Sequence, residues 1–302
     1  MRLYVFNPEN DMALANGSAG YVPPAPIRKF REDNWALPKI WAGENDVVWD
    51  GIESLRDYDI TEVCPWGWSK AIVHELWKAG VRREVMPSDE WIDNIKTLSS
   101  RCFSAKIQRE LKLYVAVCQT WEQIELFVKK HGRSVMKMLW SSSGKGLMMT
   151  DGNNARAWME NAVARDGAVV CEYWMDKELD FALEFFINKD GTAVYEGLSI
   201  FNTAATGRFL GQDCRSESER KQLLLTKVEE KNLNTLVDWW RNRLMSPDIR
   251  AFGYYGPMGI DMLVDGRGRI NPCVEINWRM TMGHVSIWCN KTQKNIDILN
   301  FF

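Results

Sequence analysis

Apolar and polar residues alternate on both sides of a short glycine-rich turn near the C-terminus. The alternating segments are residues 258–264 and 270–277, and residues 265–269 (Asp-Gly-Arg-Gly-Arg) lie between them. Alternation with a period of two is typical of a strand with one buried face, and a Gly-rich turn between two such segments is typical of a hairpin. The pattern therefore predicts an antiparallel pair of strands.

This predicted hairpin gathers acidic side chains on one face. Because strand side chains repeat with a period of two, Glu275 and Asn277 share a face. If the residues that flank the turn pair with each other, Asp261 lies opposite Cys273, and Glu275 is its diagonal neighbour at roughly 7–8 Å. Two carboxylates and an amide oxygen suit Mg²⁺, with phosphate oxygens as further ligands. A solvated sheet face that carries acids is the alternative.

A second segment combines a lysine with a small-residue loop. Residues 134–140 form a short apolar run that contains Lys137, and Ser-Ser-Ser-Gly-Lys-Gly follows at 141–146. A P-loop requires Gly-Lys followed by Ser or Thr and a helix, so the pattern instead predicts strand, loop, strand. Such a loop can fold over polyphosphate, and a lysine in an apolar strand needs an anionic partner. A surface hairpin with a Ser/Gly turn is the alternative.

Elsewhere, short strands are predicted to alternate with helices. Capping residues mark helix starts, and glycines mark helix ends. Strands are expected at 3–6, 46–49 and 60–64, and helices at 69–79, from 88 through 95, at 120–131, from 153 or 154 to about 165, and at 216–245.

The order of these parts resembles the ATP-grasp superfamily, whose members mostly join a carboxylate to an amine or thiol through an acyl phosphate. The resemblance covers residues 95–285, and its most specific element is the late pair Gly-Ile-Asp261 and Glu275-Ile-Asn277. It implies an α/β (α+β) fold in which an N-terminal α/β lobe precedes two α+β lobes that clasp the nucleotide. On this basis, residues 1–95 form the acceptor-substrate domain, and residues 96–302 form the nucleotide-binding and catalytic domain, with a lid subdomain at 105–175.

The resemblance also implies roles for individual residues. Lys137 looks like the strand lysine that contacts the α- and β-phosphates, and Arg279 looks like an arginine beside the transferred phosphate. Further expected nucleotide contacts are the lid residues Ser142, Ser143, Gly144 and Gly146 and the hinge residues Glu172, Trp174 and Met175. The expected ligands of Mg²⁺, or of Mn²⁺, are Asp261, Glu275 and Asn277.

Two of these assignments have alternatives. An early phosphate contact matches Arg101 by position, and an arginine can hold phosphate with two hydrogen bonds. Lys106 is the alternative. The ribose carboxylate matches Glu178, with Asp180 as its rival, because the spacing leaves one residue of slack.

Two N-terminal loops are candidates for the substrate site. Asn10 and Asp11 follow the first predicted strand, and Trp66 and Trp68 follow a later one. In parallel α/β sheets, ligands gather beyond the carboxyl ends of strands, so we expect the first pair to orient an amine and the second to wall a pocket. Ordinary turn chemistry is the alternative. The loop at 201–208 adds Arg208 as a candidate catalytic or substrate-contacting residue.

Composition and charge exclude several classes of function. A formal net charge of −2 over 302 residues argues against non-specific nucleic-acid binding. No apolar run reaches the roughly 18 residues of a membrane span, and the opening strand-like segment is too short for a signal-peptide core. Seven cysteines without a CxxC pair indicate reduced thiols and a cytoplasmic protein. The three histidines are far apart in sequence and support no nucleophile–histidine motif.

The sequence therefore predicts an ATP- and Mg²⁺-dependent ligase that joins a carboxylate to an amine or thiol and releases ADP and phosphate. Small-molecule or peptide carboxylates and amines are the expected substrates. The alternatives are a phosphotransferase on the same nucleotide scaffold and a nucleotide-binding regulatory module without turnover.

Overall fold

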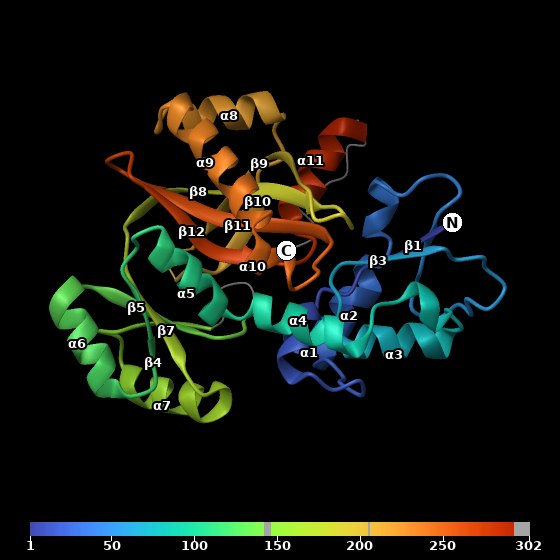
Figure 1. Cartoon of the computed structure of the whole chain (residues 1–302), viewed down its shortest axis with the longest axis horizontal. Helices are drawn as coiled ribbons and strands as arrows, with labels where there is room; N and C mark the ends of the chain where they lie inside the picture. The colour runs from blue at the N-terminus through green and yellow to red at the C-terminus, as the bar shows by residue number, and fades with distance from the viewer. Residues whose placement is uncertain (142–145, 205, 293–302) are drawn as a thin grey trace.

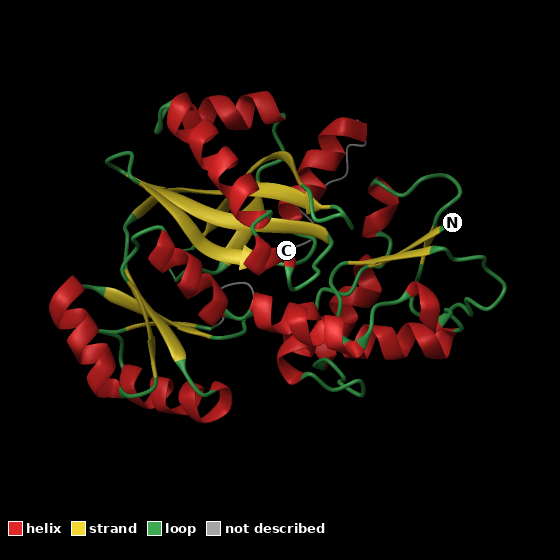
Figure 2. Cartoon of the chain, in the orientation of Figure 1, coloured by secondary structure: helices red, strands yellow, loops and turns green. Residues whose placement is uncertain are grey.

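Three β-sheets, of three, four and five strands, follow one another along the chain (Figures 1 and 2). The computed structural model describes residues 1–141, 146–204 and 206–292. Helices pack on each sheet (Figure 2), and residues of the five-stranded sheet, the four-stranded sheet and the N-terminal lobe line one cleft. The three lobes therefore enclose a common cleft.

The three-stranded sheet belongs to the N-terminal lobe and is parallel, with the order β2-β1-β3. Its strands are β1 (Arg2–Val5), β2 (Val47–Val48) and β3 (Glu62–Pro65). The lobe's helices are α1 (Asn10–Asn16), α2 (Ala25–Asn34), α3 (Lys70–Ala79) and α4 (Asp89–Ser99), with the 3₁₀ helices η1 (Leu37–Ile40) and η2 (Arg83–Val85). Ser69 and Ser88 each accept a backbone N–H at a helix start, and Gly80 ends α3 at a φ of 110°. These caps confirm the predicted limits of α3 and the predicted start of α4.

The four-stranded sheet is antiparallel, with the order β4-β7-β5-β6. Its strands are β4 (Val115–Cys118), β5 (Ser134–Met138), β6 (Leu147–Met149) and β7 (Val169–Tyr173). On one face pack α6 (Trp121–His131) and α7 (Ala155–Asp166), and on the other packs α5 (Arg101–Glu110). A capping box of Thr120 and Gln123 is present at the start of α6, where the sequence predicted a helix to begin.

The five-stranded sheet is antiparallel, with the order β10-β9-β8-β11-β12. Its strands are β8 (Lys177–Ile187), β9 (Ala193–Thr203), β10 (Phe209–Gln212), β11 (Gly256–Asp265) and β12 (Ile270–Asn277). Its helices are α8 (Glu217–Leu225), α9 (Glu230–Leu244), α10 (Pro247–Arg250) and α11 (Met282–Thr292). The prediction of one helical region over 216–245 is wrong, because the helical conformation is interrupted between α8 and α9. Val228 is buried in the core there, so the backbone turns inward.

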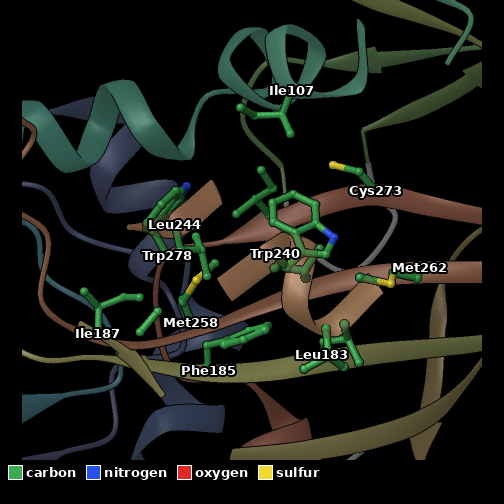
Figure 3. Close-up of a cluster of buried hydrophobic side chains, with 14 of the residues drawn as sticks. Ile107, Leu183, Phe185, Ile187, Trp240, Leu244, Met258, Met262, Cys273 and Trp278 are labelled. Atoms are coloured by element: carbon green, nitrogen blue, oxygen red, sulfur yellow. The ribbon is translucent and has the colours of Figure 1, made fainter. Parts of the chain in front are cut away.

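The largest core lies between the five-stranded sheet and helices that include α5 and α9 (Figure 3). Leu183 and Phe185 of β8 are fully buried in it, as is Trp240 of α9. The indole N–H of Trp240 donates to the carbonyl oxygen of Pro272 at 3.1 Å, which satisfies its polar group. Because alternate residues of a strand point to opposite faces, the other face of this sheet is available for polar side chains.

The cysteines are consistent with the predicted reduced state. All seven lie within the described residues, and each is a free thiol. In the same part of the chain, no helix combines the length and the apolar character needed to cross a membrane.

Phe185 and Phe186 test the assigned faces of β8. Phe185 is fully buried, so Phe185→Ala should lower the free energy of unfolding by about 3–5 kcal/mol. Phe186 is 36% exposed on the opposite face, so Phe186→Ala should cost about 1 kcal/mol or less. Urea unfolding of both variants measures the difference. Equal losses would contradict this orientation of the strand.

Candidate functional site

A cleft of about 320 Å³ lies where the three sheets meet. Its floor is the polar face of the five-stranded sheet, and the walls come from β5, β6 and β7 of the four-stranded sheet and from helices and loops of the N-terminal lobe. Along β8, Asp180 lies near the β7–β8 connection and Glu184 lies near the N-terminal lobe. These two lining residues are four positions apart, which is roughly 13 Å along a strand. The lining of the cleft therefore extends at least this far along the sheet.

The predicted hairpin is present, and the residues next to its turn pair as predicted. The prediction that Asp261 lies opposite Cys273 is wrong, because Asp261 pairs directly with Glu275. The register shifts between these pairs and the turn, in a part of β12 that contains Pro272. Proline has no N–H for a regular ladder, and such a bulge re-aims the side chains that follow. The two carboxylates therefore oppose each other more closely than predicted.

The opposed carboxylates carry an electrostatic cost. Burial, followed by the charges of Glu275 and Glu184, raises the pKa of Asp261 well above its usual range. The amide of Asn277 donates to Asp261 Oδ2 at 3.1 Å. A divalent cation between the carboxylates would remove this repulsion, so the donor set fits Mg²⁺. Among the described residues, no group of three or more His, Cys, Asp or Glu side chains is placed to hold a metal.

Lys137 has an anionic partner within the protein. Its ammonium lies 2.7 Å from Glu172 and donates to the carbonyl oxygen of Val274 at 3.1 Å. Both members of the pair are buried at the edge of the cleft. An ammonium has three donors, so within the described residues these contacts leave one N–H for a ligand. Glu172, predicted as part of a hinge, is therefore also the charge partner of the predicted phosphate lysine.

Arg101 lies behind the cleft and joins two sheets. It donates to Ser141 at the end of the four-stranded sheet and contacts Glu275 of β12 at 2.5 Å. It is not among the residues that line the cleft. Lys106 instead pairs with Asp248 at the surface. Of the two candidates, only Arg101 is adjacent to the predicted metal ligands.

The predicted lid is described only at its edges. Ser142, Ser143 and Gly144 lie outside the described residues. The carbonyl oxygen of Gly146 accepts the N–H of Met138 at 2.9 Å. A Cβ at Gly146 would lie 2.3 Å from the hydroxyl oxygen of Ser141, so close packing explains the glycine.

A β-bulge in β8 gives the two ribose candidates, Glu178 and Asp180, different orientations. Trp174 and Met175 line the cleft, as does Asp180, which accepts hydrogen bonds from Lys177 at 2.5 Å and from Thr203 at 2.7 Å. Glu178 is outside the lining and pairs with Lys227 at the surface. The register shift between β8 and β11 at this point turns Glu178 away, so the structure favours Asp180.

Arg279 joins the hairpin to the N-terminal lobe. Its guanidinium donates to both oxygens of Asp11, at 2.9 and 2.7 Å, and to Asn277 Oδ1 at 3.1 Å. Burial opposes its charge, but Asp11 and the hairpin carboxylates raise the pKa of Arg279 above its ordinary value. Arg279 thus lies beside the predicted metal ligands. Asp11, predicted to hold an amine, is already engaged in an ion pair.

Of the other three N-terminal residues predicted to contact substrate, one lines the cleft and two do not. Trp66 lines the cleft, whereas Asn10 and Trp68 do not. Asn10 is 3% exposed and packs so closely on Gly67 that a Cβ there would lie 2.3 Å from the Asn10 amide. Trp68 packs edge-on against Trp91, with ring centroids 6.5 Å apart. Asn10 and Trp68 therefore pack within the N-terminal lobe and not against the cleft.

Arg208 is not brought into the cleft. It is exposed in the connection between β9 and β10, although its neighbours Gly207 and Phe209 both line the cleft. The strand alternation on either side turns its side chain outward.

Glu184 is a lining residue that the sequence interpretation missed. It accepts hydrogen bonds from Ser199 and Thr281, each at 2.8 Å, and lies 3.2 Å from a ring nitrogen of His284. Burial raises its pKa to about 7. The available signal was a lone acid within the apolar run Phe-Ala-Leu-Glu-Phe-Phe-Ile at 181–187.

Comparisons with known proteins identify the fold. The structure is similar to N5-carboxyaminoimidazole synthetase of Staphylococcus aureus complexed with ADP, with a TM-score of 0.53 and 9% identity over 99% of this chain and 80% of that chain. It is also similar to a biotin carboxylase–β,γ-ATP complex of Campylobacter jejuni, with a TM-score of 0.55 and 14% identity over 99% of this chain and 72% of that chain. Both are ATP-grasp enzymes, so this chain has the predicted ATP-grasp fold.

One curated relative adds a likeness in sequence. The [butirosin acyl-carrier protein]–L-glutamate ligase of Niallia circulans is 26% identical over 165 residues, which are 49% of this chain and 33% of the relative. The match thus spans about a third of the relative's length. No family model matches the chain.

The raised pKa of Glu184 predicts a pH dependence of stability. The unfolded chain loses this proton near pH 4.5 and the folded chain near pH 7, so stability should fall as the pH rises between these values. The loss corresponds to roughly 3 kcal/mol, and Glu184→Gln should remove it. Urea unfolding of both proteins at pH 5 and pH 8 tests this. Parallel pH profiles would contradict a protonated, buried Glu184.

Proposed function

We propose that this protein, which has the ATP-grasp fold, is an ATP- and Mg²⁺-dependent ligase that joins a carboxylate to an amine or thiol. The supporting observation is that one cleft contains Lys137, the opposed carboxylates Asp261 and Glu275, and Arg279. Phosphoryl transfer depends on positioned cations and on neutralisation of phosphate charge, and these groups can supply both. The partial likeness to a ligase of Niallia circulans supports the same class.

The nucleotide is proposed to lie along the five-stranded sheet. Its base would occupy the β7–β8 end beside Trp174 and Met175, and its ribose would be held by Asp180. Lys137 would contact the phosphates with its remaining N–H. This order follows the lining residues from the β7–β8 connection toward the hairpin.

The hairpin would hold the metal ion. Asp261, Glu275 and Asn277 would be its protein ligands, and bound Mg²⁺ supplies neutralisation of phosphate charge. Arg101 holds Glu275 in place from behind, at 2.5 Å. Arg279 has five N–H donors, of which the contacts with Asp11, Asn277 and Met280 use four, so one can reach the transferred phosphate.

The proposed reaction has two steps. A carboxylate oxygen of one substrate attacks the γ-phosphorus of ATP, and ADP leaves with the bonding electrons. The nitrogen of an amine, or a thiol sulfur, then attacks the acyl carbon, loses a proton and displaces inorganic phosphate. We place this reaction in the cytoplasm, on small-molecule or peptide substrates; the free thiols support a reducing compartment.

Lys137→Met should weaken binding of Mg-ATP roughly 10- to 150-fold, because one charged hydrogen bond is worth roughly 1.5–3 kcal/mol. Thermal-shift and calorimetric titrations measure this loss. Lys106→Met is the matched control, because Lys106 pairs with Asp248 outside the cleft.

A second variant guards against misfolding of the first. Lys137→Met leaves Glu172 buried without its cation, so Lys137→Met/Glu172→Gln restores a neutral pair. The double variant should be more stable than Lys137→Met and still bind nucleotide weakly. Wild-type affinity in a folded Lys137 variant would refute the placement of the phosphates.

Hydroxylamine trapping tests the acyl phosphate. With ATP, Mg²⁺ and pooled carboxylates, the wild-type protein should yield a hydroxamate and stoichiometric ADP, both read by mass spectrometry. Asp261→Asn and Glu275→Gln should lose this turnover, because each removes negative charge from the metal ligands. A stable phosphorylated product would establish a phosphotransferase instead. Tight nucleotide binding without ADP release from any pool would favour a regulatory module.

A further inference from the structure

The end of the cleft nearest the N-terminal lobe has an apolar wall. Its aromatic and aliphatic lining residues are Phe6, Pro8, Phe30, Leu37, Trp66 and Met282. The ring of Phe6 meets those of Phe30 and Trp66 edge-on, at centroid distances of 5.9 and 5.2 Å. These contacts fix the wall in place, and burial of an apolar ligand group against it is favourable.

The floor at this same end contains the buried carboxylate of Glu184. Two glycines make room for it: a Cβ at Gly283 would lie 1.8 Å from Glu184 Oε1, and a Cβ at Gly259 would lie 2.5 Å from Oε2. Gly283 lines the cleft, and Gly259 lies in β11 of the hairpin. The backbone is therefore built around a carboxylate at this position.

Glu184 has no lysine or arginine in direct contact among the described residues. Its contacts are the hydroxyl groups of Ser199 and Thr281 and the ring of His284. The nearest lining arginine, Arg279, is held by both oxygens of Asp11. A buried carboxylate is stabilised by a cation in contact, and a ligand ammonium group can supply one.

We propose that this end of the cleft binds the acceptor amine, with the ammonium group against Glu184 and an apolar, aromatic-sized group against the N-terminal wall. The proposal rests on the proposed ligase function, since it names the amine substrate of that reaction. A free carboxylate is disfavoured here because Glu184 and Asp11 are both acidic and Arg279 is already paired. Small polar amines are disfavoured because they leave the wall uncovered.

Binding of three simple probes distinguishes these requirements. Wild-type protein saturated with Mg²⁺ and a non-hydrolysable ATP analogue would be titrated calorimetrically with phenethylamine, 3-phenylpropionate and ethanolamine. Phenethylamine, which has both the ammonium and the ring, should bind at least roughly tenfold more tightly than either of the others. Equal or tighter binding of 3-phenylpropionate or ethanolamine, or no binding of phenethylamine, would overturn the proposal.

Matched variants assign the two contacts. Glu184→Gln keeps the shape of the side chain and should weaken phenethylamine binding roughly tenfold or more, whereas Glu196→Gln, which alters another acid near His284 outside the cleft lining, should not. Phe30→Ala should weaken phenethylamine but not ethanolamine, with Phe186→Ala as its control. Unchanged phenethylamine affinity in both Glu184→Gln and Phe30→Ala would refute the site.

Nucleotide affinity is measured on every protein in the same series. If the wild type binds the ATP analogue but the probes do not discriminate as expected, the amine site is wrong and the ligase proposal stands. If the wild type does not bind the analogue, the proposed function itself fails. A folded Glu184→Gln variant that retains nucleotide binding and loses the amine supports the site directly.

Discussion

The direct opposition of Asp261 and Glu275 across one hairpin is the constraint around which the site is arranged. Two like charges on a partly buried sheet face are costly unless cations or donors lie next to them. Arg101 of α5 contacts Glu275, and Asn277 donates to Asp261. Asn277 belongs to the hairpin itself, whereas Arg101 comes from α5, so its contact with Glu275 also fastens α5 to the five-stranded sheet.

The compensation extends to the N-terminal lobe through one arginine. Arg279 contacts Asn277 on the hairpin and both oxygens of Asp11 in α1. The backbone N–H of Met280 donates to the carbonyl oxygen of Trp66 at 2.8 Å beside it. The lobe that supplies the apolar wall is thereby held at a fixed position relative to the predicted metal ligands. Arg279 is thus in contact with both Asn277, a predicted metal ligand, and Asp11 of the N-terminal lobe.

Local sequence rules predicted the elements well and the fine register poorly. The hairpin, the capping boxes and the lysine in β5 follow from short-range periodicity and capping, which one sequence contains. The side of Glu178 and the partner of Asp261 depend on bulges, which arise from pairing with distant strands. Asp11 was predicted to orient an amine, but it is paired with Arg279, which lies 268 residues away and could not be read from local pattern.

Lys137 and Glu184 show why an isolated charge in an apolar strand has two meanings. Both residues are buried at the cleft, and each interrupts an otherwise apolar segment. Lys137 is paired with Glu172 at 2.7 Å, so the protein itself balances much of its charge. Glu184 is surrounded by hydroxyl groups and an imidazole, which stabilise a carboxylate without supplying a permanent positive charge. The charges of Arg279 and Arg220 also act on Glu184, but among the described residues no lysine or arginine is in direct contact with it, and this difference from Lys137 is what a sequence pattern alone cannot reveal.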